Sequence, residues 1–176
     1  TLSGPFGVGT EISCQVTPSD GKEDGTPIDT SVTIANAVPT VVSVTLSPST
    51  VYTSDTITAT AVFSDGDGQN VTGHYDWHVN GQLIQSSGTN LLSGIAYFDK
   101  GDSVFVIVTP NDGIEDGLPL TSSLTTISNS LPTAPTISLS PDPAFEGIDD
   151  LLCSIDVPST DGDSDSISYT YAWTDP

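Results

Sequence analysis

Short segments in which apolar and polar residues alternate recur along the whole chain. In the central region they are residues 41–46, 56–62, 75–79, 104–109 and 124–127. Alternation and β-branched residues are typical of β-strands with one buried face. Clusters of Pro, Gly, Asn and Asp separate these segments, and no segment shows the 3.6-residue period of a helix. The sequence therefore predicts an all-β protein.

The chain also repeats its own sequence. Residues 9–27 recur as residues 101–119, and the residues around Trp77 recur around Trp173. A repeat of about 94 residues with about seven strands fits an immunoglobulin-like β-sandwich. The predicted fold class is therefore tandem immunoglobulin-like sandwiches. We read the chain as one period of a two-domain repeat, cut inside a domain.

Three parts follow from this repeat. We letter the seven strands of one domain A to G in chain order. Residues 1–37 are then the C-terminal half of a domain, with strands F and G, and residues 38–131 are a complete domain. Residues 132–176 are the N-terminal half of a domain, with strands A, B and C. Each half exposes an unpaired edge and part of a core, so neither is expected to be stable alone. We expect the last part of one copy to be completed by residues 1–37 of the next copy, head to tail. In these halves the expected strands are residues 11–16, 30–34, 136–139, 150–155 and 169–173.

The charge of the chain rules out a basic nucleic-acid-binding surface and disfavours binding to an anionic membrane. The chain has 23 acidic residues, two basic residues and a net charge of −21. Nucleic acids and anionic membrane surfaces are bound by clustered Lys or Arg, so neither is expected as a partner. No run of about 18 apolar residues predicts a membrane-inserted helix. A halophilic surface is a rival explanation of the charge, but it would spread the acidic residues evenly.

Three segments resemble a known family. They are TPSDGKEDG at 17–25, NAVPT at 36–40 and DGDSDSISYTYAW at 161–173. They are similar to the bacterial immunoglobulin-like repeats, related to PKD and cadherin-like modules, of large secreted surface proteins. The resemblance implies an extracellular location, frequent Ca²⁺ at loops, and a role as stalk, adhesin or filament.

Acidic loops are the strongest candidate site. The B–C loop carries Asp65 and Asp67, and the F–G loop carries Asp112, Glu115 and Asp116. Both loops leave the same pole of a sandwich, beside the linker 35–39. Hard oxygen ligands separated by Gly suit Ca²⁺. Ordinary Asp-Gly turns on a soluble surface are the alternative.

A second set of acidic residues is equivalent to this one. It consists of Asp161, Asp163 and Asp165 at the end of one copy with Asp20, Glu23 and Asp24 at the start of the next. Like charges this close together are costly without a cation. We therefore expect Ca²⁺ at both junctions.

The two cysteines fall in different parts of the chain. Alignment of the repeats places Cys14 on strand F and Cys153 on strand B, where immunoglobulin domains carry a disulfide packed on a strand-C Trp. Trp173 is the Trp of that domain. Within one copy the cysteines are expected to be too far apart to pair. A disulfide between successive copies is predicted, with two buried free thiols as the alternative.

Catalytic motifs are missing from the sequence, so we do not expect an enzyme. His74 and His78 are expected to be solvated, and Asn70 begins a possible N-glycosylation sequon. The expected function is a structural repeat of an extracellular bacterial fibre or surface stalk, with Ca²⁺ at its junctions. The alternative is an adhesin that binds a receptor or glycan through residues 81–96. Whether copies are covalently continuous or separate subunits is left open.

Overall fold

The structure is a computed structural model that describes residues 1–174. It contains 13 strands in four sheets and, among the described residues, a single turn of 3-10 helix. In chain order these elements are β1 (Glu11–Val16), β2 (Ile28–Thr33), β3 (Thr40–Ser47), β4 (Val51–Tyr52), β5 (Thr56–Ser64), β6 (Thr72–Val79), β7 (Gln82–Ser87), β8 (Leu91–Ser93), η1 (Gly94–Ala96), β9 (Ser103–Asn111), β10 (Leu120–Thr121), β11 (Thr125–Ser128), β12 (Thr136–Ser140) and β13 (Leu152–Val157). The predicted all-β class is confirmed.

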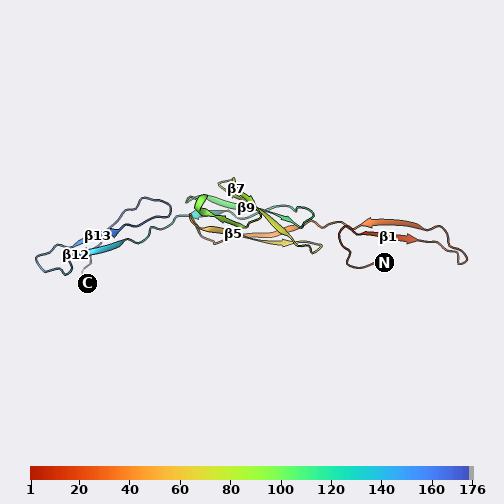
Figure 1. The fold of residues 1–176 in the computed structure, drawn as a ribbon, viewed down its shortest axis with the longest axis horizontal. Helices are drawn as coiled ribbons and strands as arrows, with labels where there is room; N and C mark the ends of the chain where they lie inside the picture. The colour runs from red at the N-terminus through yellow and green to blue at the C-terminus, as the bar shows by residue number, and fades with distance from the viewer. Residues whose placement is uncertain (175–176) are drawn as a thin grey trace.

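The molecule is elongated, with three parts in a row (Figure 1). Strands β1 and β2 form an antiparallel hairpin at one end, which we call the N-terminal hairpin. Strands β3 to β11 form the middle unit, residues 38–131. Strands β12 and β13 pair in the C-terminal segment, residues 132–174, at the other end. Each terminal part therefore contacts at most one neighbour within the chain.

Two sheets of the middle unit face each other across a common core. One sheet has the order β4-β11-β9-β6-β7 with β10 beside β9, and the other has the order β3-β5-β8. Both sheets contribute buried side chains. The buried apolar residues are Val51, Ile57, Ala59, Tyr75, Trp77, Val79, Leu92, Phe98, Val104, Val106, Val108 and Ile127. Full burial of a large apolar side chain is worth roughly 1.5–3 kcal/mol, so this core is the main source of stability.

Strand β9 shows how the sequence pattern produces this core. Along β9 every second residue is buried, so Val104, Val106 and Val108 point into the core while their neighbours are half-buried. The side chains of a strand alternate between its two faces. The strand pattern of the sequence predicts Ile57, Trp77, Val104 and Val106 as core residues of the middle unit, and all four have an exposed fraction of 0%. The predicted core is thus confirmed.

Most expected strands are present, and one is not. The segments expected to be strands in the middle unit correspond to β3, β5, β6, β9 and β11, while β4, β7, β8 and β10 are additional. Residues 169–173 form no strand. Their counterpart in the middle unit, β6, is hydrogen-bonded to β9. The counterpart of β9 is β1, which lies at the opposite end of the molecule, so these residues have no strand to pair with (Figure 1).

The finer assignment to tandem immunoglobulin-like sandwiches remains a prediction. In the described part of the chain, no helix has the length and apolar character needed to cross a membrane.

Candidate functional site

The C-terminal acidic loop consists of Asp161, Asp163 and Asp165. The carboxylate of Asp161 accepts hydrogen bonds from the backbone N–H groups of Asp163 at 2.8 Å and Asp165 at 3.2 Å. These bonds fold the loop around the Asp161 side chain. As a result, one carboxylate oxygen from each of the three residues lies within 4.8 Å of the others, and all three side chains are half-buried.

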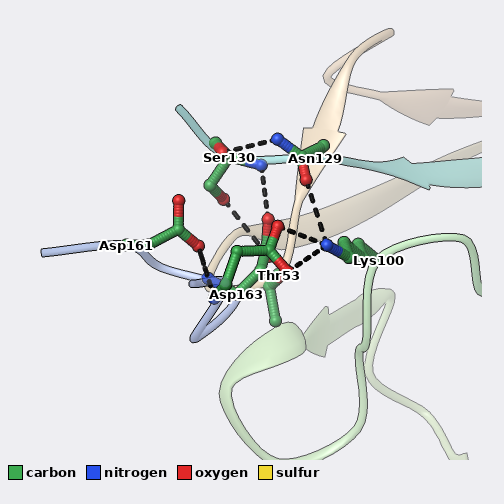
Figure 2. Close-up of polar contacts among 7 residues, drawn as sticks. Thr53, Lys100, Asn129, Ser130, Asp161 and Asp163 are labelled. Carbon is green, nitrogen blue, oxygen red and sulfur yellow. Dashed lines mark hydrogen bonds and ion pairs between the residues drawn. The ribbon is translucent and has the colours of Figure 1, made fainter. Parts of the chain in front are cut away.

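This loop contacts the end of the middle unit from which the chain continues into the C-terminal segment (Figure 2). Asp163 accepts a hydrogen bond from the backbone N–H of Ser130 at 2.5 Å and another from the hydroxyl of Thr53. Asp165 forms an ion pair with Lys100. The loops that carry Thr53 and Lys100, together with the linker residue Ser130, therefore hold the C-terminal segment.

The pKa values of the groups at this contact follow from its hydrogen bonds. The Thr53 hydroxyl and then the Ser130 N–H hold the pKa of Asp163 below its usual value. The hydrogen bond to Asp165 raises the pKa of Lys100. Both groups are therefore charged at neutral pH. The Lys100–Asp165 pair is partly exposed, so it contributes more to the position of the loop than to stability.

The acidic loop of the middle unit has the same internal geometry. Asp65 accepts hydrogen bonds from the N–H groups of Asp67 at 2.8 Å and Gln69 at 3.1 Å. Asp67 then accepts the backbone N–H of Ala37 at 2.6 Å, in the same way that Asp163 accepts that of Ser130. The two junctions therefore use one loop design, with Gln69 at the position that Asp165 occupies in the C-terminal segment.

Asn36 joins the two acidic loops of the middle unit. Its side-chain amide donates to Asp112 at 2.8 Å and to Glu115 at 2.9 Å. Its side-chain oxygen accepts the amide of Gln69 at 3.0 Å. The loops carrying Asp65 and Asp112 therefore meet at the linker, as the sequence predicted.

The bonds to Asp112 also change its pKa. The Asn36 amide and then the Glu115 N–H lower it, and Asp112 is one of two buried polar residues in the described chain. Asp116 takes a different partner, because its carboxylate accepts the side-chain amide of Asn111 at 2.7 Å. Among the described residues, a group of three or more potential metal ligands within 4.8 Å forms at Asp161, Asp163 and Asp165 and not at this junction.

We call the contact between the N-terminal hairpin and the middle unit the middle junction. Two acceptor atoms at this junction are buried without a hydrogen-bond partner. They are one carboxylate oxygen of Asp65 and the side-chain oxygen of Gln69. A buried acceptor without a donor is costly, and a cation is one species that satisfies such atoms.

The N-terminal acidic loop lies between β1 and β2. Asp20 accepts the N–H groups of Lys22 at 2.8 Å and Glu23 at 3.0 Å, and the Glu23 and Lys22 N–H groups lower its pKa. Asp112 makes the equivalent bonds to Ile114 and Glu115 at 2.7 and 2.9 Å. Within one chain this loop is at the end of the molecule away from the C-terminal segment (Figure 1). Asp20, Glu23 and Asp24 therefore do not meet Asp161, Asp163 and Asp165 in the same copy.

The cysteines are free, and the described chain contains no disulfide. Cys14 is exposed on β1 and Cys153 is half-buried on β13. They belong to the two terminal parts, as the sequence predicted.

The remaining candidates have ordinary surroundings. His74 bonds to Ser86 at 2.8 Å, while the ring of His78 stacks on Phe105 at a centroid distance of 4.7 Å. Asn70 is exposed in a loop, and whether it is glycosylated remains a prediction.

Sequence reasoning missed the partners of the acidic loops. These are Asn36, Thr53, Gln69, Lys100 and Ser130. The repeat itself held a signal, because Asn36 and Asn129 both end a repeat and Gln69 aligns with Asp165.

Comparison with known proteins gave no match to a family model, a curated protein or a solved structure.

Proposed function

We propose that this chain is a structural repeat of an extracellular bacterial fibre or surface stalk, and that Ca²⁺ binds at the junctions between its immunoglobulin-like domains. The observation that carries the proposal is the contact between Asp163 and Ser130. It attaches the acidic loop of the C-terminal segment directly to the end of the preceding part, the middle unit. A stalk needs such contacts, because neighbouring domains on a short linker otherwise move freely.

The residues at the C-terminal junction fit Ca²⁺. The carboxylates of Asp161, Asp163 and Asp165 are hard oxygen ligands within 4.8 Å of one another, and Ca²⁺ takes six to eight such oxygens. Asp20, Glu23 and Asp24 of the next copy would supply further carboxylates. Bound Ca²⁺ would supply the positive charge that this set of acidic groups lacks.

The middle junction fits a cation for a different reason. Its oxygens on Asp65 and Gln69 are buried without partners. Asp67, Asp112, Glu115 and Asp116 are the other candidate ligands there. The Asn36 amide already bridges Asp112 and Glu115, so part of the repulsion in this set is relieved by hydrogen bonds.

An extracellular location agrees with this chemistry. Ca²⁺ sites of extracellular modules bind in the range of about 10⁻⁴–10⁻³ M, which cytosolic Ca²⁺ does not reach. Oxidising surroundings would also allow Cys14 and Cys153 of successive copies to form the predicted disulfide.

Calorimetric titration of the chain with Ca²⁺, with Mg²⁺ as the control ion, tests the metal proposal. We expect Ca²⁺ to bind, to raise the melting temperature and to narrow the range of shapes seen by small-angle scattering, because ligand binding stabilises the folded state. A chelator should reverse all three effects.

Two variants locate the C-terminal site. Asp161→Asn keeps the side-chain shape and removes a charged ligand, so it should weaken Ca²⁺ binding. Asp142→Asn removes the same charge in the β12–β13 loop and should leave binding unchanged. Absence of Ca²⁺ binding, or equal losses in both variants, would refute the metal proposal.

A further inference from the structure

The C-terminal segment carries an apolar groove of about 450 Å³. Strands β12 and β13 form one side of it and residues 169–173 form the other. The residues that line it include Ile137, Leu139, Cys153, Ile155, Tyr171 and Trp173. Trp173 has an exposed fraction of 59%, whereas Trp77, its counterpart in the middle unit, has 0%. A large apolar surface of this kind marks an interaction site.

The middle unit shows what covers the equivalent surface. There Leu46 pairs with Ala59 across β3 and β5, as Leu139 pairs with Cys153 across β12 and β13. Strand β9 pairs with β6, placing Val106 opposite Trp77. The side chains that close the core over Trp77 therefore come from β9.

The N-terminal hairpin has the geometry of β9 and its neighbours. The N–H of Gly9 donates to the carbonyl of Ile34 at 2.8 Å, and that of Gly101 donates to the carbonyl of Ile127 at 2.8 Å. Its apolar side chains are uncovered: Val16 is 60% exposed, while its counterpart Val108 is 0% exposed. The hairpin thus carries an exposed apolar face equivalent to the one that covers Trp77 in the middle unit. It lies at the opposite end of the molecule from the groove (Figure 1).

We infer that the groove of one copy binds the N-terminal hairpin of a second copy, and that the two parts together complete one domain. The register follows from the middle unit, where Tyr75 lies opposite Val108. In the complex, Tyr171 lies opposite Val16 and Trp173 opposite Cys14. This inference deepens the proposed structural role and rests on it.

The loops beside the groove point to the same partner. In the middle unit, a Cβ added at Gly117 would collide with the carbonyl oxygen of Pro39, so these two segments are in close contact. The counterpart of Gly117 is Gly25, whose nearest atoms in this chain all belong to Pro18. The counterpart of Pro39 is Pro132, which is exposed. Binding of the hairpin brings Gly25 against Pro132 of the other copy.

Asn129 gives a second indication at the same place. Its counterpart Asn36 donates to Asp112 and Glu115. In this chain the Asn129 amide donates instead to the carbonyl of Ser130, its own neighbour. In the complex the Asn129 amide donates to Asp20 and Glu23 of the second copy, which are the counterparts of Asp112 and Glu115.

Each copy has one groove and one hairpin at opposite ends, so binding leaves a free groove and a free hairpin on every complex. Such a heterologous contact propagates into an open filament unless its rotation closes a ring. Because the groove and the hairpin lie at opposite ends of an elongated molecule, we expect successive copies to assemble linearly (Figure 1).

Light scattering of the full chain in millimolar Ca²⁺, over a range of concentrations, tests this inference. We expect mass to grow with concentration and Trp emission to shift to the blue, because Trp173 becomes buried while Trp77 is buried throughout. Val16→Asp places a charge on the face that enters the groove and should abolish both effects. Gln15→Asp adds the same charge on the other face of β1 and should retain them.

Cross-linking tests the register. With oxidised glutathione as oxidant, Cys14 of one copy and Cys153 of another form one disulfide and release two molecules of reduced glutathione. We expect a ladder of linked chains on a non-reducing gel, and Cys14→Ser or Cys153→Ser alone should abolish it. A chain that stays monomeric in Ca²⁺, equal effects of Val16→Asp and Gln15→Asp, or Cys14–Cys14 links would overturn the inference.

The test separates the two proposals. Monomers that still bind Ca²⁺ at the junctions would remove the groove inference and leave the metal proposal intact. Filaments that form while calorimetry detects no Ca²⁺ binding would remove the metal proposal and leave the groove inference intact.

Discussion

The carboxylate of Asp163 accepts the backbone N–H of Ser130 at 2.5 Å, and this contact joins the C-terminal acidic loop to the end of the middle unit. The equivalent contact between Asp67 and Ala37 joins the other junction at 2.6 Å. The same kind of hydrogen bond is therefore present at both junctions, so the junction is itself part of the repeat.

Asp163→Asn tests this contact. The variant keeps the shape of the side chain but removes the charge of the acceptor, and charged acceptors form the stronger hydrogen bonds. We expect faster hydrogen exchange at the Ser130 N–H and a broader distribution of shapes in small-angle scattering. Asp156→Asn on β13 is the control. Unchanged exchange at Ser130 would contradict a holding role for Asp163.

Trp77 and Trp173 give a matched pair for the role of burial. Trp77→Ala should destabilise the middle unit by about 3–5 kcal/mol, because it opens a cavity in a fully buried core. Trp173→Ala should leave the melting temperature of the monomeric chain nearly unchanged, because its side chain is largely exposed there. Thermal unfolding at low protein concentration measures both. A large loss of stability from Trp173→Ala would show that the groove is covered within one chain.

Asp112 predicts how stability depends on pH. Its pKa is lowered from 3.8 in the folded state, first by the Asn36 amide and then by the Glu115 N–H. The unfolded chain therefore binds the proton more tightly than the folded chain does. The stabilisation is complete well above pH 3.8 and is lost as pH falls from there through the lower folded value. Urea unfolding between pH 3 and 7 should show this loss, and Asp112→Asn should reduce it.

Asn36→Ala examines the cause of that pKa. Removal of the largest contribution should move the pKa of Asp112 upward, toward its ordinary value. Loss of the bridge also leaves Asp112 and Glu115 facing each other without a donor between them, so the middle unit should be less stable. Carboxyl chemical shifts in an NMR titration report the pKa. A pKa that stays low in the variant would assign the effect to backbone N–H groups alone.

Two copies joined from Pro176 to Thr1 test the composite domain inside a single molecule. We expect calorimetry to show a further cooperative transition that the single chain lacks, because the joined chain contains one groove and one hairpin of successive copies. Val16→Asp in the second copy should remove that transition. The same substitution in the first copy is the control, because that hairpin has no groove to enter.

Alternation along the chain was sufficient to predict most of the strands and much of the core, although β4, β7, β8 and β10 were not expected. Val104, Val106 and Val108 are buried because a strand turns every second side chain to the same face. The repeat similarly placed Asp65 and Asp112 near one linker. Local pattern carries this information because strands and turns are decided by neighbouring residues.

The contacts of the acidic loops could not be predicted in the same way. Asn36 reaches Asp112 across 76 positions, and Lys100 reaches Asp165 across 65. Which loops meet at such distances depends on how the parts are arranged in space. Residues 169–173 show that a local pattern is also not enough to form a strand. Their sequence is typical of a strand, but they form none because the chain offers no strand for them to pair with.

The contact of Lys100 with Asp165 has a consequence for proteolysis. The chain has two basic residues, so a protease that cuts after Lys or Arg has two sites, after Lys22 and after Lys100. Lys100 is held at the junction by Asp165, and Lys22 lies in the hairpin loop that the groove inference places against another copy. Cleavage after Lys100 requires the junction to open, so its rate measures how often the C-terminal acidic loop detaches from the middle unit.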